Sequence, residues 1–508
     1  MSRARLPPGL AVAAVCIAAA IAYAPSFGVP FQFDDEARLS NNRAMQAGAW
    51  AGALRWLGNS RVVPSATLLL NYRLGEFDPR GYHAVNFAVH LLATLGVFAL
   101  ARVLCRTPRL AAAWPPPRAL WLATAAALLF ACHPLQTQAV TYVIQRYASM
   151  AALFYVWAVV CYLRGRLRQR RLEAGGATPY FAAATVLAIG AVLSKENAVS
   201  LPAALLLGEW VGFGRPRRWR ALALGAGAVM AIAAMPLIWK ALVWQPTLTP
   251  GPPPPQLPFL ERLVEVLARR DTALAATRPS PLAYLFTQAT VLPRYLRLVV
   301  RPWDLNIDHD VPIASGLSGP VIAGAAGLAA FATLGLVLMR RWPLAAFAIL
   351  WFFVTLSVES SVLPIDDAMM EHRMYLPMAG LAIGGGWVLG EAAARAPRAA
   401  SAAGAALAAA LIALTFARNV VWLSPVTLWL DAAGKSPGKA RAQLNAGAAY
   451  HRAERLDEAV AHYCRALALA PGDPLARANL ELALVMQGKD LPPGEEPLET
   501  NELVAFCP

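Results

Sequence analysis

Long apolar segments recur along almost the whole of this chain, and they constrain its fold more than any other feature. Hydrophobic residues make up 58% of the sequence and charged residues only 15%. An apolar segment of about 20 residues can cross a bilayer as a helix. We therefore predict an all-α polytopic membrane protein with eleven transmembrane helices. The expected spans are 8–25, 86–104, 119–132, 148–163, 178–193, 198–213, 221–239, 320–339, 343–358, 374–393 and 399–421.

Arginine clusters between these segments predict how the chain is oriented. If the N-terminus is inside, the clusters fall on the cytoplasmic side, as the positive-inside rule requires, and the C-terminus lies outside. Segment 281–300 is ambiguous because Pro293, Arg294 and Arg297 interrupt it. We interpret it as a helix that lies at the interface or enters the membrane partway. The net charge of +15 follows from the cytoplasmic loops and does not indicate nucleic-acid binding.

Three adjacent acids, Asp34, Asp35 and Glu36, follow the first apolar segment and fall in the first outer loop. Adjacent carboxylates repel one another, so the pKa of at least one should rise into the range that suits a general base. The alternative is a solvated turn beside a span. We favour a catalytic base, because carboxylates are nowhere else so densely placed this close to an expected span.

Seven further residues of the outer loops and helix starts have side chains that suit a phosphate or a sugar. Ionisable residues this close to the membrane usually have a function. An arginine at the start of a helix forms charge-assisted hydrogen bonds with a lipid phosphate. The alternatives are an ion pair that closes a hairpin, a helix cap, and a side chain that snorkels to the interface. The candidates are His133, Lys195, Glu196, Glu371, His372, Arg373 and Tyr375.

The sequence gives little support for a metal or nucleotide site. Asp308, His309 and Asp310 have the side chains of metal ligands, but no further His or Cys lies at a defined spacing from them. The sequence has no glycine-rich phosphate loop either, so ATP-driven transport is not supported. We expect no resident metal or cofactor, although acids beside a phosphate can recruit a divalent cation.

The C-terminal region predicts a small helical domain. Residues 441–474 match the tetratricopeptide period of about 34 residues, and 476–488 begin a second unit. Such stacks usually need about three units to be stable, so we expect this one to lean on the membrane domain. It serves either as a platform for a protein or peptide or as a stabilising cap.

We therefore divide the chain into three parts. The transmembrane domain is 1–424, with outer loops 26–86 and 240–319, the tetratricopeptide-repeat domain is 425–490, and the tail is 491–508. Cys464 and Cys507 can form a disulfide that pins the tail if this region faces an oxidising compartment. The other four cysteines lie in or at the end of apolar segments and are expected to be small buried hydrophobes.

Several motifs occur in the order in which the TMTC family carries them. They are Phe33-Asp34-Asp35, 70–74, 78–86, His90, the segment from His133 to Arg146, and Lys195-Glu196. The chain thus resembles the TMTC proteins, which are transmembrane and tetratricopeptide-repeat O-mannosyltransferases of the GT-C class. The resemblance implies a GT-C bundle and a polyprenyl-phosphate-linked sugar as donor. It also implies that an acid of the first outer loop is the base, here Asp34 or Asp35.

Further roles and some departures follow from the resemblance. Arg146 joins the donor-binding residues. The family usually has an arginine directly before the proline at 64, where this chain has Val63, and eukaryotic members have acids where this chain has Gln138 and Ser149. These departures bear on the identity of the acceptor and the sugar. The residues expected to position the acceptor or the first outer loop are Arg61, Asn71, Tyr82 and His83.

We therefore predict a glycosyltransferase of a bacterial inner membrane that acts on its periplasmic face. It transfers a sugar from polyprenyl phosphate, in a single inverting step, to an acceptor hydroxyl on a protein or peptide. The alternatives are transfer to a glycolipid or an envelope polysaccharide, and a non-catalytic membrane scaffold whose tetratricopeptide repeat recruits envelope partners. Membrane lipids are expected partners in every case. The expected roles are deprotonation of the acceptor by Asp34 or Asp35, orientation by Glu36 and Glu196, and neutralisation of the leaving phosphate by His372, Arg373 and Arg146.

Overall fold

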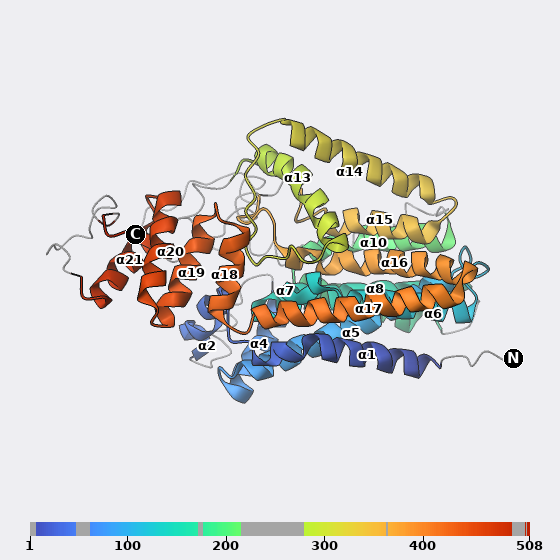
Figure 1. Cartoon of the computed structure of the whole chain (residues 1–508). Coiled ribbons are helices and arrows are strands. Elements are labelled where there is room, and N and C mark those ends of the chain that lie inside the picture. Colours follow the sequence, from blue (N-terminus) through green and yellow to red (C-terminus); the bar gives the residue numbers. More distant parts are fainter. Residues whose placement is uncertain are drawn as a thin grey trace, which may run out of the picture.

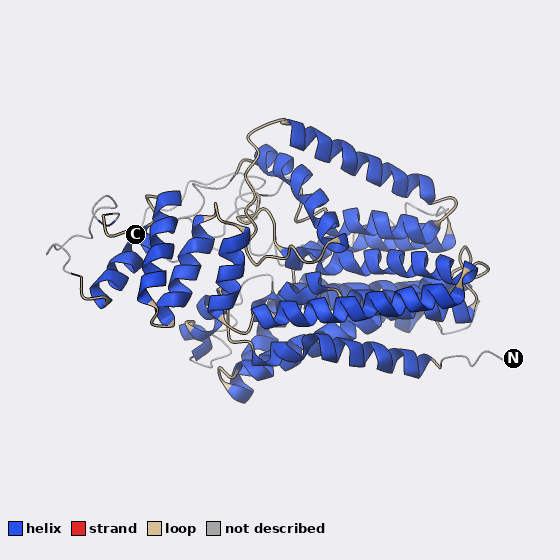
Figure 2. Ribbon diagram, viewed as in Figure 1, coloured by secondary structure: helices blue, strands red, loops and turns tan. Residues whose placement is uncertain are grey.

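The computed structural model describes residues 7–46, 61–170, 176–214, 279–361, 364–489, 503 and 505–507. These residues form helices and loops, without a strand among them (Figure 2). A long bundle of roughly parallel helices carries a smaller stack of helices at one end, and the N-terminus lies at the opposite end (Figure 1). The all-α prediction is confirmed for the described part of the chain.

Among the described residues, eleven long helices form the bundle, and two of these eleven, α13 and α14, lie at its side. Small residues let neighbouring helices approach closely, since a Cβ added at Gly386 of α16 would lie 2.7 Å from the carbonyl oxygen of Leu122 in α6. The helices are α1 (Pro8–Tyr23), α5 (Pro79–Cys105), α6 (Pro116–Cys132), α8 (Arg146–Arg170), α9 (Thr178–Val192), α10 (Leu201–Phe213), α13 (Pro281–Val300), α14 (Gly319–Leu338), α15 (Pro343–Leu356), α16 (Tyr375–Arg395) and α17 (Pro397–Val421).

Five helical segments of the described chain are long and apolar enough to cross a membrane. A sixth is possible if the pair Pro116–Cys132 and Pro134–Val140, bent by 53°, counts as one span. The chain is therefore a multi-pass membrane protein. The total of eleven spans stays a prediction, because α9 and α15 are shorter apolar helices and the expected span 221–239 lies outside the described residues. The five segments are Pro8–Gly28, Pro79–Cys105, Val143–Arg170, Gly319–Leu338 and Pro397–Val421.

The ambiguous segment forms α13, a 20-residue helix with Pro293 inside it. It runs obliquely to the bundle, beside the largely exposed α14 (Figure 1). One face buries Tyr284 and Tyr295, while Leu282 and Val300 are exposed. This two-sided character fits a helix at an interface, and its depth in the bilayer stays a prediction.

The stack at the end of the bundle consists of α18 (Pro425–Lys435), α19 (Ala440–Arg452), α20 (Leu456–Leu469) and α21 (Pro474–Met486). Gly447 allows α19 and α20 to pack closely, since a Cβ there would lie 2.6 Å from the ring of Tyr463. Cys464 forms a disulfide with Cys507, and the side chain of Leu503 is fully buried against the stack. The assignment of these helices to tetratricopeptide repeats stays a prediction.

Candidate functional site

The three acids Asp34, Asp35 and Glu36 form an acidic turn that follows the 3₁₀ helix η1 (Ala24–Gly28) and leads into the short helix η2 (Glu36–Ser40). This turn lies at the end of the bundle that meets the stack (Figure 1). The backbone N–H of Asp34 donates to the hydroxyl of Tyr142 at 2.9 Å. The side chain of Asp34 is 42% exposed, and its carboxylate lies 3.9 Å from Arg38. Its carboxylate is therefore accessible from outside the protein.

Asp35 has the opposite environment. Its side chain is buried, and its two oxygens accept hydrogen bonds from the backbone N–H groups of Ile144 (2.7 Å) and Gln32 (3.2 Å). Burial raises the pKa of Asp35 to about 8, and the neighbouring carboxylate of Asp34 makes a smaller contribution in the same direction. The cause is thus mainly desolvation, whereas the sequence had indicated repulsion between adjacent acids.

The acidic turn also contacts the C-terminal stack. Glu36 forms an ion pair with Arg452 of α19 at 3.1 Å. Phe33, directly before the acids, has a φ of 51°, which is unusual for a residue with a side chain. Its ring packs against Trp429 of α18 at 5.3 Å, so contacts with the stack help to hold this backbone conformation.

Arg146 lies inside the protein at the start of α8. Its guanidinium donates to the side chains of Asn86 (2.6 Å) and Thr67 (3.1 Å) and to the carbonyl of Tyr82 (3.0 Å). Each of its three nitrogens is therefore engaged by a protein atom. In this structure Arg146 joins α4 (Val62–Gly75), α5 and α8, and its role toward a donor phosphate stays a prediction.

Three of the four residues expected to position the acceptor or the first outer loop contact backbone carbonyls of that region. The ring of His83 lies 2.8 Å from the carbonyl of Val29, Asn71 donates to the carbonyl of Gly81, and the hydroxyl of Tyr82 donates to the carbonyl of Glu76. The helix α5 begins at Pro79, within the range 26–86 expected for the first outer loop, and the bounds of that loop stay a prediction.

Two of the predicted donor-binding residues lie within the bundle. The hydroxyl of Tyr375 lies 2.7 Å from Nδ1 of His90, and Nε2 of His133 lies 2.9 Å from the carbonyl of Val299. Both side chains are buried. They connect neighbouring helices near the site. Within the described part of the chain, neither side chain forms a hydrogen bond with the acidic turn.

A cluster of charged residues gathers near the start of α8. Lys195 lies 2.6 Å from Glu359, and Asn197 donates to the same carboxylate at 3.1 Å. Arg61 donates to Glu196 at 3.1 Å. Lys195 and Glu196 do not form one ion pair that closes a hairpin, because each pairs with a residue from another part of the chain.

Arg61 connects this cluster with the surroundings of the acidic turn. Its guanidinium lies 5.1 Å from the ring centre of Tyr147, which is three residues after the Ile144 that donates to Asp35. Favourable interaction with Glu196 raises the pKa of Arg61 although burial opposes this. The cluster and the acids therefore lie at the same end of the bundle.

Arg373 adds a third cation. Its guanidinium donates to the carbonyls of Asp367 (2.6 Å) and Ala368 (3.2 Å). Burial lowers the pKa of Arg373, but Tyr284, Tyr295 and the carboxylates of Glu359 and Asp367 outweigh it, and the net pKa is raised. Burial lowers the pKa of Lys195, while Glu359 opposes the change.

The same buried cations, Lys195 and Arg373, lower the pKa values of both His372 and Glu359. Burial is the main reason why the pKa of His372 is well below its usual value, and the cations Lys195, Arg373 and Arg61 lower it further, so the ring is neutral. Burial alone raises the pKa of Glu359, but Lys195 and Arg373 outweigh it, and the net pKa is lowered. Three cations, Arg61, Lys195 and Arg373, thus gather around the carboxylates of Glu196 and Glu359, and the carboxylate of Asp367 also acts on Arg373.

Sequence reasoning missed Glu359 as a site residue. The available signal was an isolated acid directly after the apolar segment of α15, which is a costly position unless a cation lies nearby.

The segment 305–310 is fixed between the bundle and the stack. Glu371 accepts a hydrogen bond from the backbone of Asn306 at 2.5 Å and lies 2.9 Å from the ring of His309. Asp308 accepts two hydrogen bonds from Arg441 and forms an ion pair with Lys439. These contacts occupy the side chains of Asp308 and His309, and within the described ranges no group of three His, Cys, Asp or Glu residues could hold a metal ion.

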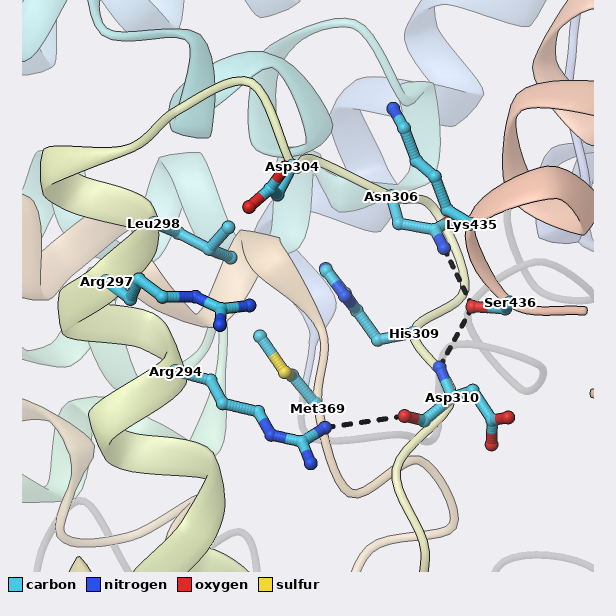
Figure 3. A pocket seen from close by; sticks show the side chains of 10 residues that line it. All are labelled: Arg294, Arg297, Leu298, Asp304, Asn306, His309, Asp310, Met369, Lys435 and Ser436. Carbon is cyan, nitrogen blue, oxygen red and sulfur yellow. Dashed lines mark hydrogen bonds between the residues drawn. The ribbon is translucent and has the colours of Figure 1, made fainter. Parts of the chain in front are cut away.

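A cavity of about 280 Å³ lies between α13, the segment 304–310 and the end of α18 (Figure 3). Arg294 donates weakly to the carbonyl of Asp310 at 3.4 Å, and the side chain of Arg297 points into the cavity (Figure 3). Asp304 also lines it, so the cavity carries both signs of charge. None of the three acids of the acidic turn lines this cavity.

Several curated proteins are similar to the chain in sequence. The chain is 27% identical to the protein O-mannosyl-transferase Tmtc2 of Drosophila melanogaster over 313 residues, which cover 58% of this chain and 30% of that protein. It is 30% identical to TMTC4 of Homo sapiens over 217 residues, or 39% of this chain and 28% of that protein. It is 34% identical to Tmtc1 of Drosophila melanogaster over 212 residues, or 39% and 22% of the two chains. The chain is a relative of the TMTC proteins.

The TMTC resemblance expected from the ordered motifs is therefore confirmed. The chain spans less than a third of the length of these TMTC relatives. No family model matches it, and no solved structure matches it. A bacterial origin stays a prediction.

Proposed function

We propose that this chain is a membrane glycosyltransferase of the GT-C class that transfers a sugar from a polyprenyl phosphate to a hydroxyl of a protein, on the outer face of the membrane. One observation carries the proposal. An accessible carboxylate, Asp34, lies at the same end of the bundle as a largely buried cluster of three cations, Arg61, Lys195 and Arg373. A base and an anion site are the two elements that transfer from a phosphate donor needs.

The reaction is a single displacement. Asp34 takes the proton of the acceptor hydroxyl as the acceptor oxygen bonds to the anomeric carbon of the sugar. The bond from that carbon to the phosphate oxygen breaks, and the phosphate leaves with the bonding electrons. One base suffices, no covalent intermediate forms, and the anomeric configuration is inverted.

We assign the base to Asp34 rather than Asp35 from the surroundings of the two carboxylates. Asp34 is half-exposed, whereas both oxygens of Asp35 accept backbone hydrogen bonds. Asp35 then keeps the turn in the geometry that presents Asp34. Glu36 is engaged by Arg452 and orients the same turn.

The cation cluster stabilises the charge that grows on the departing phosphate. Arg373 is the best suited of its three cations, because within the described part of the chain its guanidinium donates to carbonyl and hydroxyl oxygens and not to a carboxylate. Arg61 and Lys195 attract the phosphate from a longer distance, while their ion pairs with Glu196 and Glu359 hold the two cationic side chains in position. A preorganised site of this kind needs no reorganisation when the phosphate leaves.

Two observations support the outer face and a protein acceptor. The disulfide between Cys464 and Cys507 is typical of an oxidising compartment, and it belongs to the stack that contacts the acidic turn. The TMTC relatives carry the name protein O-mannosyl-transferase. Mannose is therefore the first sugar to test.

Mass spectrometry of envelope proteins and glycolipids, from cells with and without this chain, tests the proposal. We expect hexose on Ser or Thr residues of membrane or secreted proteins in cells that contain the chain, and its loss in cells without it. A difference confined to glycolipid or polysaccharide would make the proposed acceptor wrong. No difference in either fraction would favour a non-catalytic scaffold.

A further inference from the structure

Arg441, in the first turn of α19, contacts three separate segments of the membrane domain. Its guanidinium donates to both oxygens of Asp308, at 2.8 and 2.6 Å, and to the carboxylate of Asp367 at 2.5 Å. Its central carbon also lies 5.4 Å from the ring centre of Phe33. A planar guanidinium is suited to such simultaneous contacts, and a lysine ammonium is not.

Two of these segments carry residues of the proposed reaction. Phe33 directly precedes Asp34, the proposed base. Asp367 accepts a hydrogen bond from Arg373, the proposed phosphate ligand, through its backbone carbonyl at 2.6 Å. One side chain of the stack thus touches the segment of the base and the segment of the phosphate ligand together.

The electrostatics favour a persistent connection. Burial of Asp308 alone raises its pKa, but hydrogen bonds and attraction from Arg441 and Lys439 outweigh it, and the net pKa is lowered. Burial lowers the pKa of Arg441, and its two carboxylate partners more than reverse this. Among the described residues, Arg441 is the side chain that donates to the Asp367 carboxylate. Without it, that contact between the stack and the Arg373 segment is lost.

We propose that Arg441 is a positioning residue for sugar transfer, which holds the acidic turn and the segment that carries Arg373 in a fixed position relative to each other. This inference rests on the proposed function. It makes the C-terminal stack part of the machinery for transfer, in addition to any role as a platform or a cap. The competing explanation is that Arg441 only attaches the stack to the buried Asp308.

Lys439 provides the matched control. It also pairs with Asp308 and donates to the carbonyl of His309, but among the described contacts it touches neither Asp367 nor Phe33. Attachment through Asp308 should suffer in both Arg441→Met and Lys439→Met. The relative position of the acidic turn and the Arg373 segment should change only in Arg441→Met.

The experiment measures transfer kinetics of the full chain in nanodiscs with a polyprenyl-phosphate mannose donor. We expect Arg441→Met to lower kcat by about tenfold or more and Lys439→Met to change it by less than about twofold. Arg441→Lys should recover only part of the loss, because it cannot bridge both carboxylates. Asp367→Asn should reproduce most of the Arg441→Met loss, and it carries the test if Arg441→Met does not fold. Equal losses in Arg441→Met and Lys439→Met, or normal kinetics in Asp367→Asn, would overturn the inference.

Hydrogen–deuterium exchange separates a failure of this inference from a failure of the proposed function. In Arg441→Met, peptides that cover 31–38 and 364–375 should both exchange faster than in the wild type, while Lys439→Met leaves at least the second unchanged. This pattern supports the positioning contact even if no sugar transfer is found in any variant. Unchanged exchange in both peptides of Arg441→Met would contradict it, whatever the activity.

Discussion

Asp34 and Asp35 are neighbours in the chain, but the structure gives their carboxylates opposite surroundings. The side chain of Asp34 is 42% exposed, whereas Asp35 is 1% exposed and accepts two backbone hydrogen bonds. This contrast divides the roles that the sequence left open. Asp34 is available to an acceptor, and Asp35 fixes the turn, so their variants should fail in different ways.

Asp35 should give the protein a characteristic dependence on pH. Burial raises its pKa from 3.8 to about 8 in the folded state. Between these values the folded protein holds a proton that the unfolded chain has released, so stability falls as the pH rises through this window. Thermal unfolding in detergent from pH 5 to 8 should show this fall in Tm for the wild type and a shallower one for Asp35→Asn. Equal slopes would contradict the assignment.

The pair of Lys195 and Glu359 should be essential for folding as well as for the site. Both side chains are less than a tenth exposed, so Glu359→Gln leaves a buried ammonium without its carboxylate. We expect a loss of about 3–5 kcal/mol in the free energy of unfolding. Glu458→Gln, at an exposed pair with Arg455, is the control and should leave the Tm unchanged. A small effect of Glu359→Gln would mean that water reaches this pair.

The close approach of α6 and α16 should not tolerate a methyl group. A Cβ at Gly386 would lie 2.7 Å from the backbone oxygen of Leu122, which cannot move aside as a flexible side chain could. Gly386→Ala should therefore destabilise the protein by about 1–3 kcal/mol. Gly404→Ala in α17, where nothing lies within 4 Å of the new Cβ, should be neutral or stabilising. A similar Tm shift in the two variants would contradict this packing.

The disulfide between Cys464 and Cys507 tests the predicted side of the membrane. In a background without the four free cysteines, both thiols should resist maleimide in intact cells until a reductant is added. A membrane-impermeant maleimide should then label them without permeabilisation, because the stack faces outward. Labelling that requires permeabilised cells would place the stack inside. Replacing both cysteines by Ser should destabilise the stack by about 2–4 kcal/mol.

Local patterns of the sequence predicted the features that depend on neighbouring residues. Apolar segments indicated the helices, and the acids after the first one indicated the turn with Asp34. The 34-residue pattern indicated helical packing in 441–474, where Gly447 meets Tyr463. Each of these follows from composition or spacing within a short stretch.

The long-range partners could not be predicted in this way. Lys195 pairs with Glu359 and Arg441 with Asp308, and no spacing connects residues so far apart in the chain. Hence the sequence placed Lys195 beside Glu196, its neighbour, although the fold gives them separate partners. Which acid of the turn is buried was equally hidden, because it depends on packing against residue 144.

The transfer activity of Asp34→Asn tests the central claim most directly. Purified wild type and variant, in nanodiscs with polyprenyl-phosphate mannose and a Ser/Thr peptide, are compared at equal amounts, with Asp304→Asn as an exposed-acid control. Loss of a general base typically lowers the rate by about 10²–10⁴-fold. We predict a loss of this size for Asp34→Asn, with an unchanged Tm, and near wild-type transfer for Asp304→Asn. Transfer by Asp34→Asn at the wild-type rate would contradict the account.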